Sequence, residues 1–229
     1  EIPLREDFTV NTEDYIGIGK NIFIANPNAP TGIALKRDEI ERIVKSNPDN
    51  IVVIDEAYVD FGGESCVPLI KKYDNLIITM TYSKSRSMAG ARLGFGVGCE
   101  ALIRDLNTIR YSTNPYNVNR MTMAAGVGVL QDEEYTRANC KTIMENRAFT
   151  VAGLKKMGFK VLPSSANFIF VSSDRIEGGD YYRSLKEKGV LVRHFDKERI
   201  SNWCRVSIGT RESMQKYLDV TEQILKERT

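Results

Sequence analysis

Continuous apolar runs of strand length, separated by helical patterns, constrain the fold of this chain more than any other feature. Residues 22–25, 51–54 and 76–81 are runs of this kind, and 93–98 is a strand interrupted by glycines. Strands without apolar–polar alternation are typical of a sheet that is buried on both faces. Apolar residues at helical spacing over 36–45 lie between the first two runs. The pattern therefore predicts an α/β fold.

The second half of the chain has a different pattern, which predicts a second domain. Residues 117–157 have the pattern of two helices that divide near Asp132. We expect a large domain over residues 1–144 and a small α+β domain over 145–229, since about 80 residues can form a separate core. The elements expected in the small domain are strands at 166–171, 189–194 and 204–208 and helices at 180–188 and 212–226.

Charge and rare residues exclude several classes of protein. The chain has 32 basic and 30 acidic residues, which is too balanced for a nucleic-acid partner. No apolar run approaches the ~20 residues of a membrane helix, and acids precede the first apolar block, so no secretory signal is expected. The four cysteines are scattered and His194 is the only histidine, so we expect no metal site and no Ser-His-Asp triad. Unpaired thiols favour a cytoplasmic protein.

Polar residues follow three of the predicted strands at their carboxyl ends, where ligands bind in open α/β sheets. Asp55 follows residues 51–54, and we expect its carboxylate to be partly desolvated. A helix cap or a structural ion pair is the alternative for this residue. The rigid turn at 26–32 can hold the amide of Asn28 in place. Lys84 follows the third strand, where it is either a Schiff-base lysine or an ordinary surface charge.

A phosphate-binding set surrounds Lys84 in the sequence. Thr81, Ser83 and Arg92 offer two hydroxyls and a guanidinium, which are the donors that a phosphate monoester needs. A carboxylate, a lysine, a phosphate cradle and an amide at one edge of a sheet suit pyridoxal phosphate (PLP). The sequence therefore predicts a PLP site at the carboxyl ends of the strands.

Four motifs resemble those of a known family. They are NPNAPTG at 26–32, DEAY at 55–58, SK at 83–84 and AGARLG at 89–94, in the family's order and at its spacing. Together they resemble the fold-type I, PLP-dependent aminotransferases of class I/II, and the resemblance extends over nearly the whole chain. It implies a large domain with a mixed, mostly parallel sheet. Three further segments are similar to the histidinol-phosphate branch of that family: 114–119, 192–193 and 204–210.

The resemblance implies a role for each residue of the cofactor site. Lys84 would hold the cofactor covalently and move the proton at the substrate α-carbon. Asp55 would pair with the ring nitrogen, and Tyr58 would donate a hydrogen bond to the phenolic oxygen. The 5′-phosphate would be held by Thr81, Ser83 and Arg92.

The resemblance also implies the substrates. Arg205 would bind the α-carboxylate of glutamate, and Arg193 the phosphate of histidinol phosphate, although either could be a surface charge at a strand edge. The implied reaction is amino transfer between glutamate and imidazole-acetol phosphate in a homodimer. The alternatives are an aromatic aminotransferase, a threonine-phosphate decarboxylase, a ligand-sensing module with this fold, or an inactive fragment.

The chain departs from the family's pattern in two places. Ala29 stands where the family has an asparagine before Pro-Thr-Gly, so Asn28, one position earlier, is the candidate to replace it. The chain also begins inside the family's large domain. The resemblance implies that the first strands, a further phosphate contact and the aromatic ring that stacks on the cofactor precede residue 1. Whether residues 1–229 alone are catalytic stays open.

Overall fold

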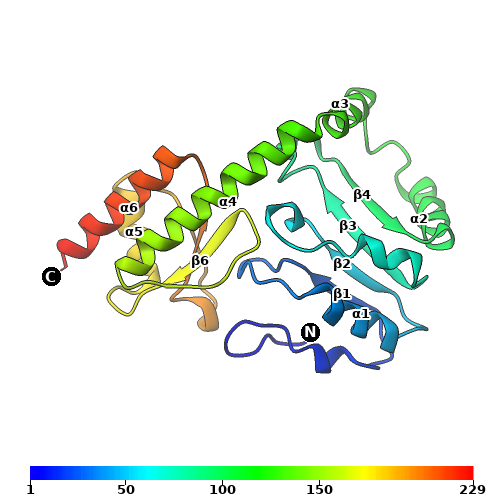
Figure 1. The fold of residues 1–229 in the computed structure, drawn as a ribbon, viewed down its shortest axis with the longest axis horizontal. Helices are drawn as coiled ribbons and strands as arrows, with labels where there is room; N and C mark the ends of the chain where they lie inside the picture. The colour runs from blue at the N-terminus through cyan, green and yellow to red at the C-terminus, as the bar shows by residue number, and fades with distance from the viewer. Residues whose placement is uncertain (229) are drawn as a thin grey trace.

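Two four-stranded sheets, each with its own apolar core, organise residues 1–228, the part of the chain that the computed structural model describes (Figure 1). The long helix α4 (Glu133–Lys156) runs past both sheets. We call the first sheet and the elements packed on it the first lobe. The second lobe is the second sheet with α5 (Gly178–Glu187), α6 (Arg211–Lys226) and the C-terminal half of α4.

The first sheet is mixed and mostly parallel, as predicted. Its strands lie in the order β1 (Ile22–Ala25), β2 (Val52–Asp55), β3 (Leu76–Thr81) and β4 (Gly94–Gly98). The first three strands are parallel, and β4 is antiparallel to β3. The helix α1 (Arg37–Ser46) joins β1 to β2 and buries Ile40, Ile43 and Val44 against the sheet.

Only one face of this sheet is fully covered within residues 1–228. Ile22 and Ile54 belong to the core on the α1 side. On the opposite face Phe23 is 77% exposed and Asp55 is also exposed. The expectation of burial on both faces is therefore wrong for this part of the chain. A run of β-branched residues can reflect either a preference for pleated strands or burial on both faces of the sheet. The pattern alone does not distinguish these two causes.

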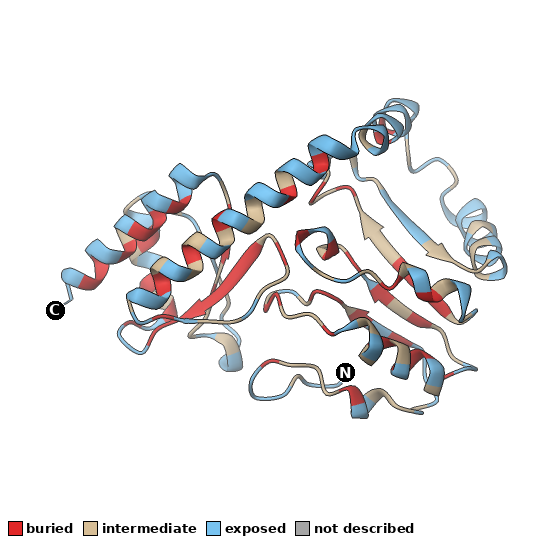
Figure 2. Cartoon of the chain, in the orientation of Figure 1, coloured by how far each residue is buried: buried red, intermediate tan, exposed pale blue. Residues whose placement is uncertain are grey.

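Three helices follow one another along the chain between the two sheets, and the first, which has no red segment in Figure 2, was not predicted. The helix α2 (Glu100–Thr113) has no buried residue, and it follows β4 directly. The helix α3 (Arg120–Gln131) ends where α4 begins, at Asp132. The division at this residue agrees with the sequence, because the Asp132 side chain caps α4 by accepting the N–H of Tyr135 at 3.2 Å.

The second sheet is antiparallel and is covered on one face by helices. Its strands lie in the order β5 (Lys160–Val161), β6 (Phe168–Ser172), β8 (Cys204–Ser207) and β7 (Arg193–His194). The strand β5 was not predicted, and β7 is much shorter than the expected 189–194. The side chains of Ile169, Val171 and Val206 point into the core that α4, α5 and α6 cover.

Short 3-10 helices connect these elements. They are η1 (Thr12–Tyr15), η2 (Val59–Phe61), η3 (Val67–Lys71), η4 (Ala89–Ala91) and η5 (Glu198–Ile200). Among residues 1–228, every helix is too short or too polar to cross a lipid bilayer.

Candidate active site

The carboxyl ends of β1, β2 and β3 bring three of the candidate segments to one edge of the first sheet. The backbone N–H of Asn26, which opens the loop after β1, donates to the carbonyl of Asp55 at 2.8 Å. Asp55 pairs in register with Thr79 of β3. Thr81 lies two residues further along β3, so its side chain is on the same face as that of Asp55.

Asp55 is open to solvent. Its carboxylate accepts the N–H of Ala57 at 3.1 Å, and no ion pair among residues 1–228 includes it. The expected partial desolvation is therefore wrong for this part of the chain, because Asp55 points to the uncovered face of the sheet. The structural ion pair that was its alternative is absent as well.

Two of the three residues expected to bind a phosphate, Thr81 and Ser83, are in direct contact. Thr81 Oγ1 donates to Ser83 Oγ at 3.0 Å and accepts the N–H of Ser83 at 3.1 Å. The N–H of Tyr82 donates to the carbonyl of Leu93 at 3.1 Å, which brings the backbone next to Arg92 close to this segment, whereas the Arg92 side chain donates from Nη1 to the carbonyl of Ala89 at 3.0 Å. Arg92 has a φ of +56°, in the left-handed region, and its side chain is exposed. The unusual backbone at this residue is typical of a functional position.

Lys84 lies at the boundary between the two lobes. Its Nζ is 5.4 Å from the ring centroid of Tyr58, and its side chain is half-buried. The ring of Tyr58 in turn packs edge-on against Phe168 of β6, with 5.1 Å between centroids. The candidate lysine is therefore connected through one aromatic ring to the second sheet.

Arg205 and Arg193 face each other on the second sheet. They are directly paired across β7 and β8, on the face opposite the helices. Arg205 lies 5.1 Å from the ring centroid of Phe168, and Arg193 lies 5.5 Å from that of Phe195. Like charges opposite each other on a sheet are unfavourable. The pair is therefore an arrangement that a bound anion would stabilise.

The Nε atom of Arg205 is the second indication of an anion site. It is buried and has no hydrogen-bond partner within residues 1–228. A buried guanidinium N–H without a partner is costly, so it points to a ligand that supplies an acceptor. Arg205 as a whole is half-buried, whereas Arg193 is exposed.

A cavity of about 330 Å³ adjoins Lys84 and is lined by both lobes. Lys84 and Ser85 come from the first lobe, Cys140 from α4, and Asn167 and Thr210 from the second lobe. Burial raises the pKa of the Cys140 thiol, so this cysteine stays protonated and is a poor nucleophile. Lys84 is the nucleophilic candidate of this cavity.

Asn28 is held within its own loop. Its Oδ1 accepts the hydroxyl of the buried Thr31 at 2.9 Å. The preceding Asn26 closes the loop by exchanging two side-chain hydrogen bonds with the backbone of Leu35, at 2.7 and 3.2 Å. This loop reaches the second lobe, because the N–H of Ser165 donates to the carbonyl of Gly32 at 2.8 Å.

Sequence reasoning missed Glu56, which fixes the turn that carries Asp55 and Tyr58. Glu56 is 1% exposed, and its carboxylate accepts Ser65 Oγ at 2.7 Å and the N–H of Cys66 at 2.5 Å. Burial raises its pKa, although the two hydrogen bonds oppose that shift. A second acid directly after a buried strand was the signal available in the sequence.

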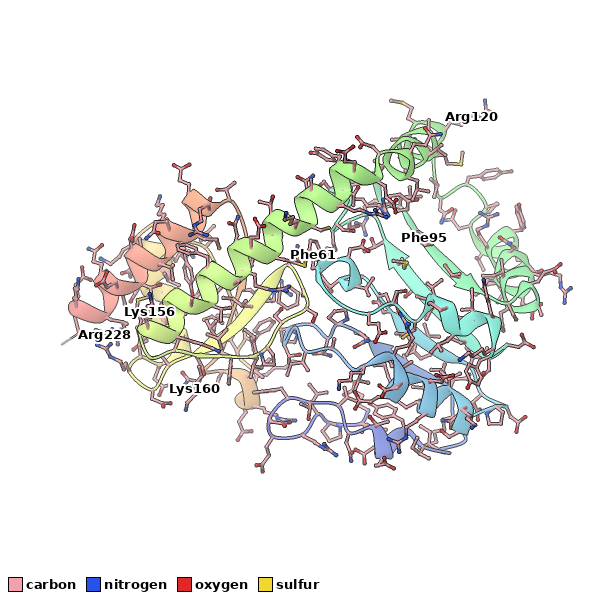
Figure 3. All side chains as sticks on the ribbon, viewed as in Figure 1. Phe61, Phe95, Arg120, Lys156, Lys160 and Arg228 are labelled. Carbon is pink, nitrogen blue, oxygen red and sulfur yellow. The ribbon has the colours of Figure 1, made fainter. Side chains whose placement is uncertain are left out.

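Arg147 of α4 was also missed, and it ties the two lobes together. Its Nη1 donates to the carbonyl of Phe61 at 2.9 Å and to the carbonyl of Ala166 at 2.6 Å. Phe61 lies beside the middle of α4, between the lobes (Figure 3). Burial lowers the pKa of Arg147. The sequence around this arginine resembles any exposed helix surface, so it held no signal.

Comparison with known proteins gives a consistent family. The model of the family described as aminotransferase class I and II matches residues 2–220. The chain is 48% identical over 227 residues to the histidinol-phosphate aminotransferase of Brachyspira hyodysenteriae. The aligned region covers 99% of this chain and 64% of that protein. It is 44% identical over 222 residues to the enzyme of that name from Clostridium botulinum strain Okra, with 97% and 63% covered. The chain thus spans less than two thirds of these relatives' length.

Solved structures agree with the sequence comparison. The histidinol-phosphate aminotransferase of Clostridium acetobutylicum superposes with a TM-score of 0.89 at 26% identity, over 98% of this chain and 70% of that one. A protein from Erwinia carotovora atroseptica, described as a putative histidinol-phosphate aminotransferase, superposes with a TM-score of 0.88 at 26% identity, over 99% and 68%.

Proposed function

Because the chain belongs to the class I and II aminotransferase family, we propose that the whole protein transfers an amino group between glutamate and imidazole-acetol phosphate. The products would be 2-oxoglutarate and histidinol phosphate, in histidine biosynthesis. The observation that carries the proposal is the pair of Arg193 and Arg205, joined to Lys84 through Phe168 and Tyr58. The names of the curated relatives support the same substrates.

The residues of the site fit PLP. The carboxylate of Asp55 is open on the uncovered face, the hydroxyls of Thr81 and Ser83 lie 3.0 Å apart, and the side chain of Arg92 is exposed. When bound, PLP supplies an electron sink for the carbanion that forms at the substrate α-carbon. Asp55 would keep the ring nitrogen protonated, and the hydroxyl pair with Arg92 would bind the phosphate.

Lys84 would carry the proton transfer at the substrate α-carbon. The face of the Tyr58 ring attracts the lysine ammonium and holds it at 5.4 Å, in the space between the lobes. The hydroxyl of Tyr58 would donate to the phenolic oxygen of the cofactor. Asn28 lies in the loop beside Asp55, and we propose it as a further cofactor contact in place of Ala29.

The two arginines would bind unlike anions in the two half-reactions. A guanidinium presents two parallel N–H groups, which match the oxygens of a carboxylate or a phosphate. The unpartnered Nε of Arg205 supports a bidentate contact with the α-carboxylate of glutamate. Arg193 is more exposed and would bind the phosphate that only the other substrate carries.

We further propose the domain division at 144/145, a homodimer and a cytoplasmic location. The two lobes with separate cores support the division, which falls inside α4. Exposed apolar side chains on α2 and α3, such as Ile109 at 60% and Met121 at 84%, support an interface between copies. Four free thiols suit a reducing compartment.

Borohydride reduction of the full-length protein with PLP tests the site. We expect the cofactor to become fixed to the peptide that contains Lys84, and Lys84→Ala to abolish both this label and amino transfer. The matched control is Lys72→Ala, which removes an exposed lysine that pairs with Glu41. Label that persists in Lys84→Ala would remove Lys84 from the mechanism. Release of carbon dioxide from threonine phosphate, without amino transfer, would favour the decarboxylase instead.

A further inference from the structure

The segment before β1 reaches across to the second lobe. Residues 5–9 form a closed turn, in which the N–H of Phe8 donates to the carbonyl of Arg5 at 2.9 Å. The ring of Phe8 leaves this turn and packs on Trp203, with 5.2 Å between centroids, and on Phe170, with 6.1 Å between centroids. Phe8 is only 8% exposed, although it lies in an N-terminal loop.

The backbone conformation of Phe8 is locally unfavourable, which indicates that the ring contacts with Trp203 and Phe170 stabilise it. Its φ is +66°, a left-handed conformation that bulky residues seldom adopt. Such a conformation persists when the surrounding contacts compensate for it. The compensating contacts come from the second lobe. Arg199 lies 5.4 Å from the Phe8 ring centroid, and its guanidinium also donates to the carbonyl of Arg5.

The partners of Phe8 are neighbours of the arginine pair. Phe170 is directly paired with Arg205 across β6 and β8, and Arg205 is directly paired with Arg193. These three side chains therefore form one row on a single face of the second sheet. Phe170 also stacks on Trp203 at 5.1 Å, two residues before Arg205. A contact on Phe170 is thus a contact on the row that holds both arginines.

We propose that Phe8 and Arg199 form a latch that sets the distance between the arginine pair and Lys84. The inference rests on the proposed function, since it needs a substrate that touches both lobes. Phe8 and Arg199 touch no substrate and are positioning residues. Arg147 joins the lobes through α4, and the latch joins them through the segment before β1. Together with the hydrogen bond from Ser165 to Gly32, these contacts leave the second lobe little freedom to turn.

The test compares glutamate and histidinol phosphate, which would contact both lobes, with inorganic phosphate, which would bind to the arginine pair alone. In the full-length protein, Phe8→Leu and Arg199→Ala should each raise the KM for glutamate and for histidinol phosphate by about tenfold, with kcat changed less than about threefold. The affinity for inorganic phosphate, followed by Trp203 fluorescence, should stay as in the wild type. The absorption of the Lys84–cofactor bond without substrate should also be unchanged. Arg199→Lys, which keeps a cation over the ring, should restore part of the loss.

Phe159→Leu is the matched control. Phe159 is 4% exposed in the core on the helix side of the second sheet, so its truncation lowers stability without touching the row. A KM within about twofold of wild type in both latch variants would overturn the proposal. So would a KM increase of the same size in Phe159→Leu, or a parallel loss of phosphate affinity in the latch variants, because either result means general disruption of the second lobe.

Hydrogen–deuterium exchange separates a failure of the latch from a failure of the proposed function. Residues 5–9 and 199–203 should exchange faster in Phe8→Leu, while residues of α6 should not. This pattern in a protein without amino transfer would refute the function and support the contact. Unchanged exchange and KM in a protein with normal amino transfer would refute the latch alone.

Discussion

Replacing Arg193 by alanine separates the two half-reactions. Arg193 is assigned to the substrate phosphate, which glutamate lacks. A charge-assisted hydrogen bond contributes about 1.5–3 kcal/mol, and because Arg193 is exposed we take the lower limit. A loss of about 1.5 kcal/mol corresponds to roughly a tenfold decrease in kcat/KM for histidinol phosphate. The value for glutamate should change less than about twofold, because its carboxylate is assigned to Arg205.

The same variant should leave stability almost unchanged. Removing Arg193 relieves its repulsion with Arg205, worth about 0.2–1 kcal/mol, and loses a cation–π contact with Phe195 of about 0.5–1 kcal/mol. These effects oppose each other, so the free energy of unfolding measured in urea should change by less than about 1 kcal/mol.

The assay is single-turnover kinetics of each half-reaction in the full-length protein. Arg183→Ala is the matched control, because it removes an exposed arginine from α5, on the other face of the sheet. Equal losses for both substrates would refute the assignment and favour an aminotransferase for ordinary amino acids.

Two further perturbations test the first lobe. Asp55→Asn should lower kcat at least about a hundredfold while PLP still binds, since the negative charge that would keep the ring nitrogen protonated is lost; near-normal turnover at full cofactor occupancy would make Asp55 structural. Burial raises the pKa of Glu56 above its ordinary value of 4.5, so its contribution to stability is present at acid pH and is lost as pH rises from 4.5 through the folded-state pKa. In urea unfolding from pH 4.5 upward, Glu56→Gln should therefore gain stability relative to wild type, and parallel curves would contradict this account.

The placement of residues at the ends of their own strands could be predicted from the sequence. Asp55 and Thr81 each end a run of apolar residues, and the open edge of a parallel sheet places such residues together. The exposure of Asp55 could not be predicted, because it depends on what covers the sheet rather than on the run itself. The division of the helices at Asp132 was predictable from a capping side chain within one turn.

Features that depend on contacts between distant segments could not be predicted from the sequence. Arg193 and Arg205 are paired through a strand of only two residues, too short for an alternating pattern. Phe8 meets Phe170 across most of the chain, and no local signal connects them. The helix α2 was missed although a local signal for it was present in the sequence. Its apolar residues Leu102, Ile103, Leu106 and Ile109 recur at helical spacing, yet none of them is buried.

Because α4 is long, a small rotation about one of its ends moves the other end by several ångströms. Its 24 residues extend over about 36 Å, so a tilt of only about 5° about one end would displace the other by about 3 Å. Because the helix passes both lobes (Figure 1), such a tilt, which the latch of Phe8 and Arg199 would oppose, alters the gap between Lys84 and the arginines. Small shear steps of packed helices are a common route for closure around a ligand. Substitutions on the outer surface of α4, far from any bound group, should therefore change how far the crevice opens.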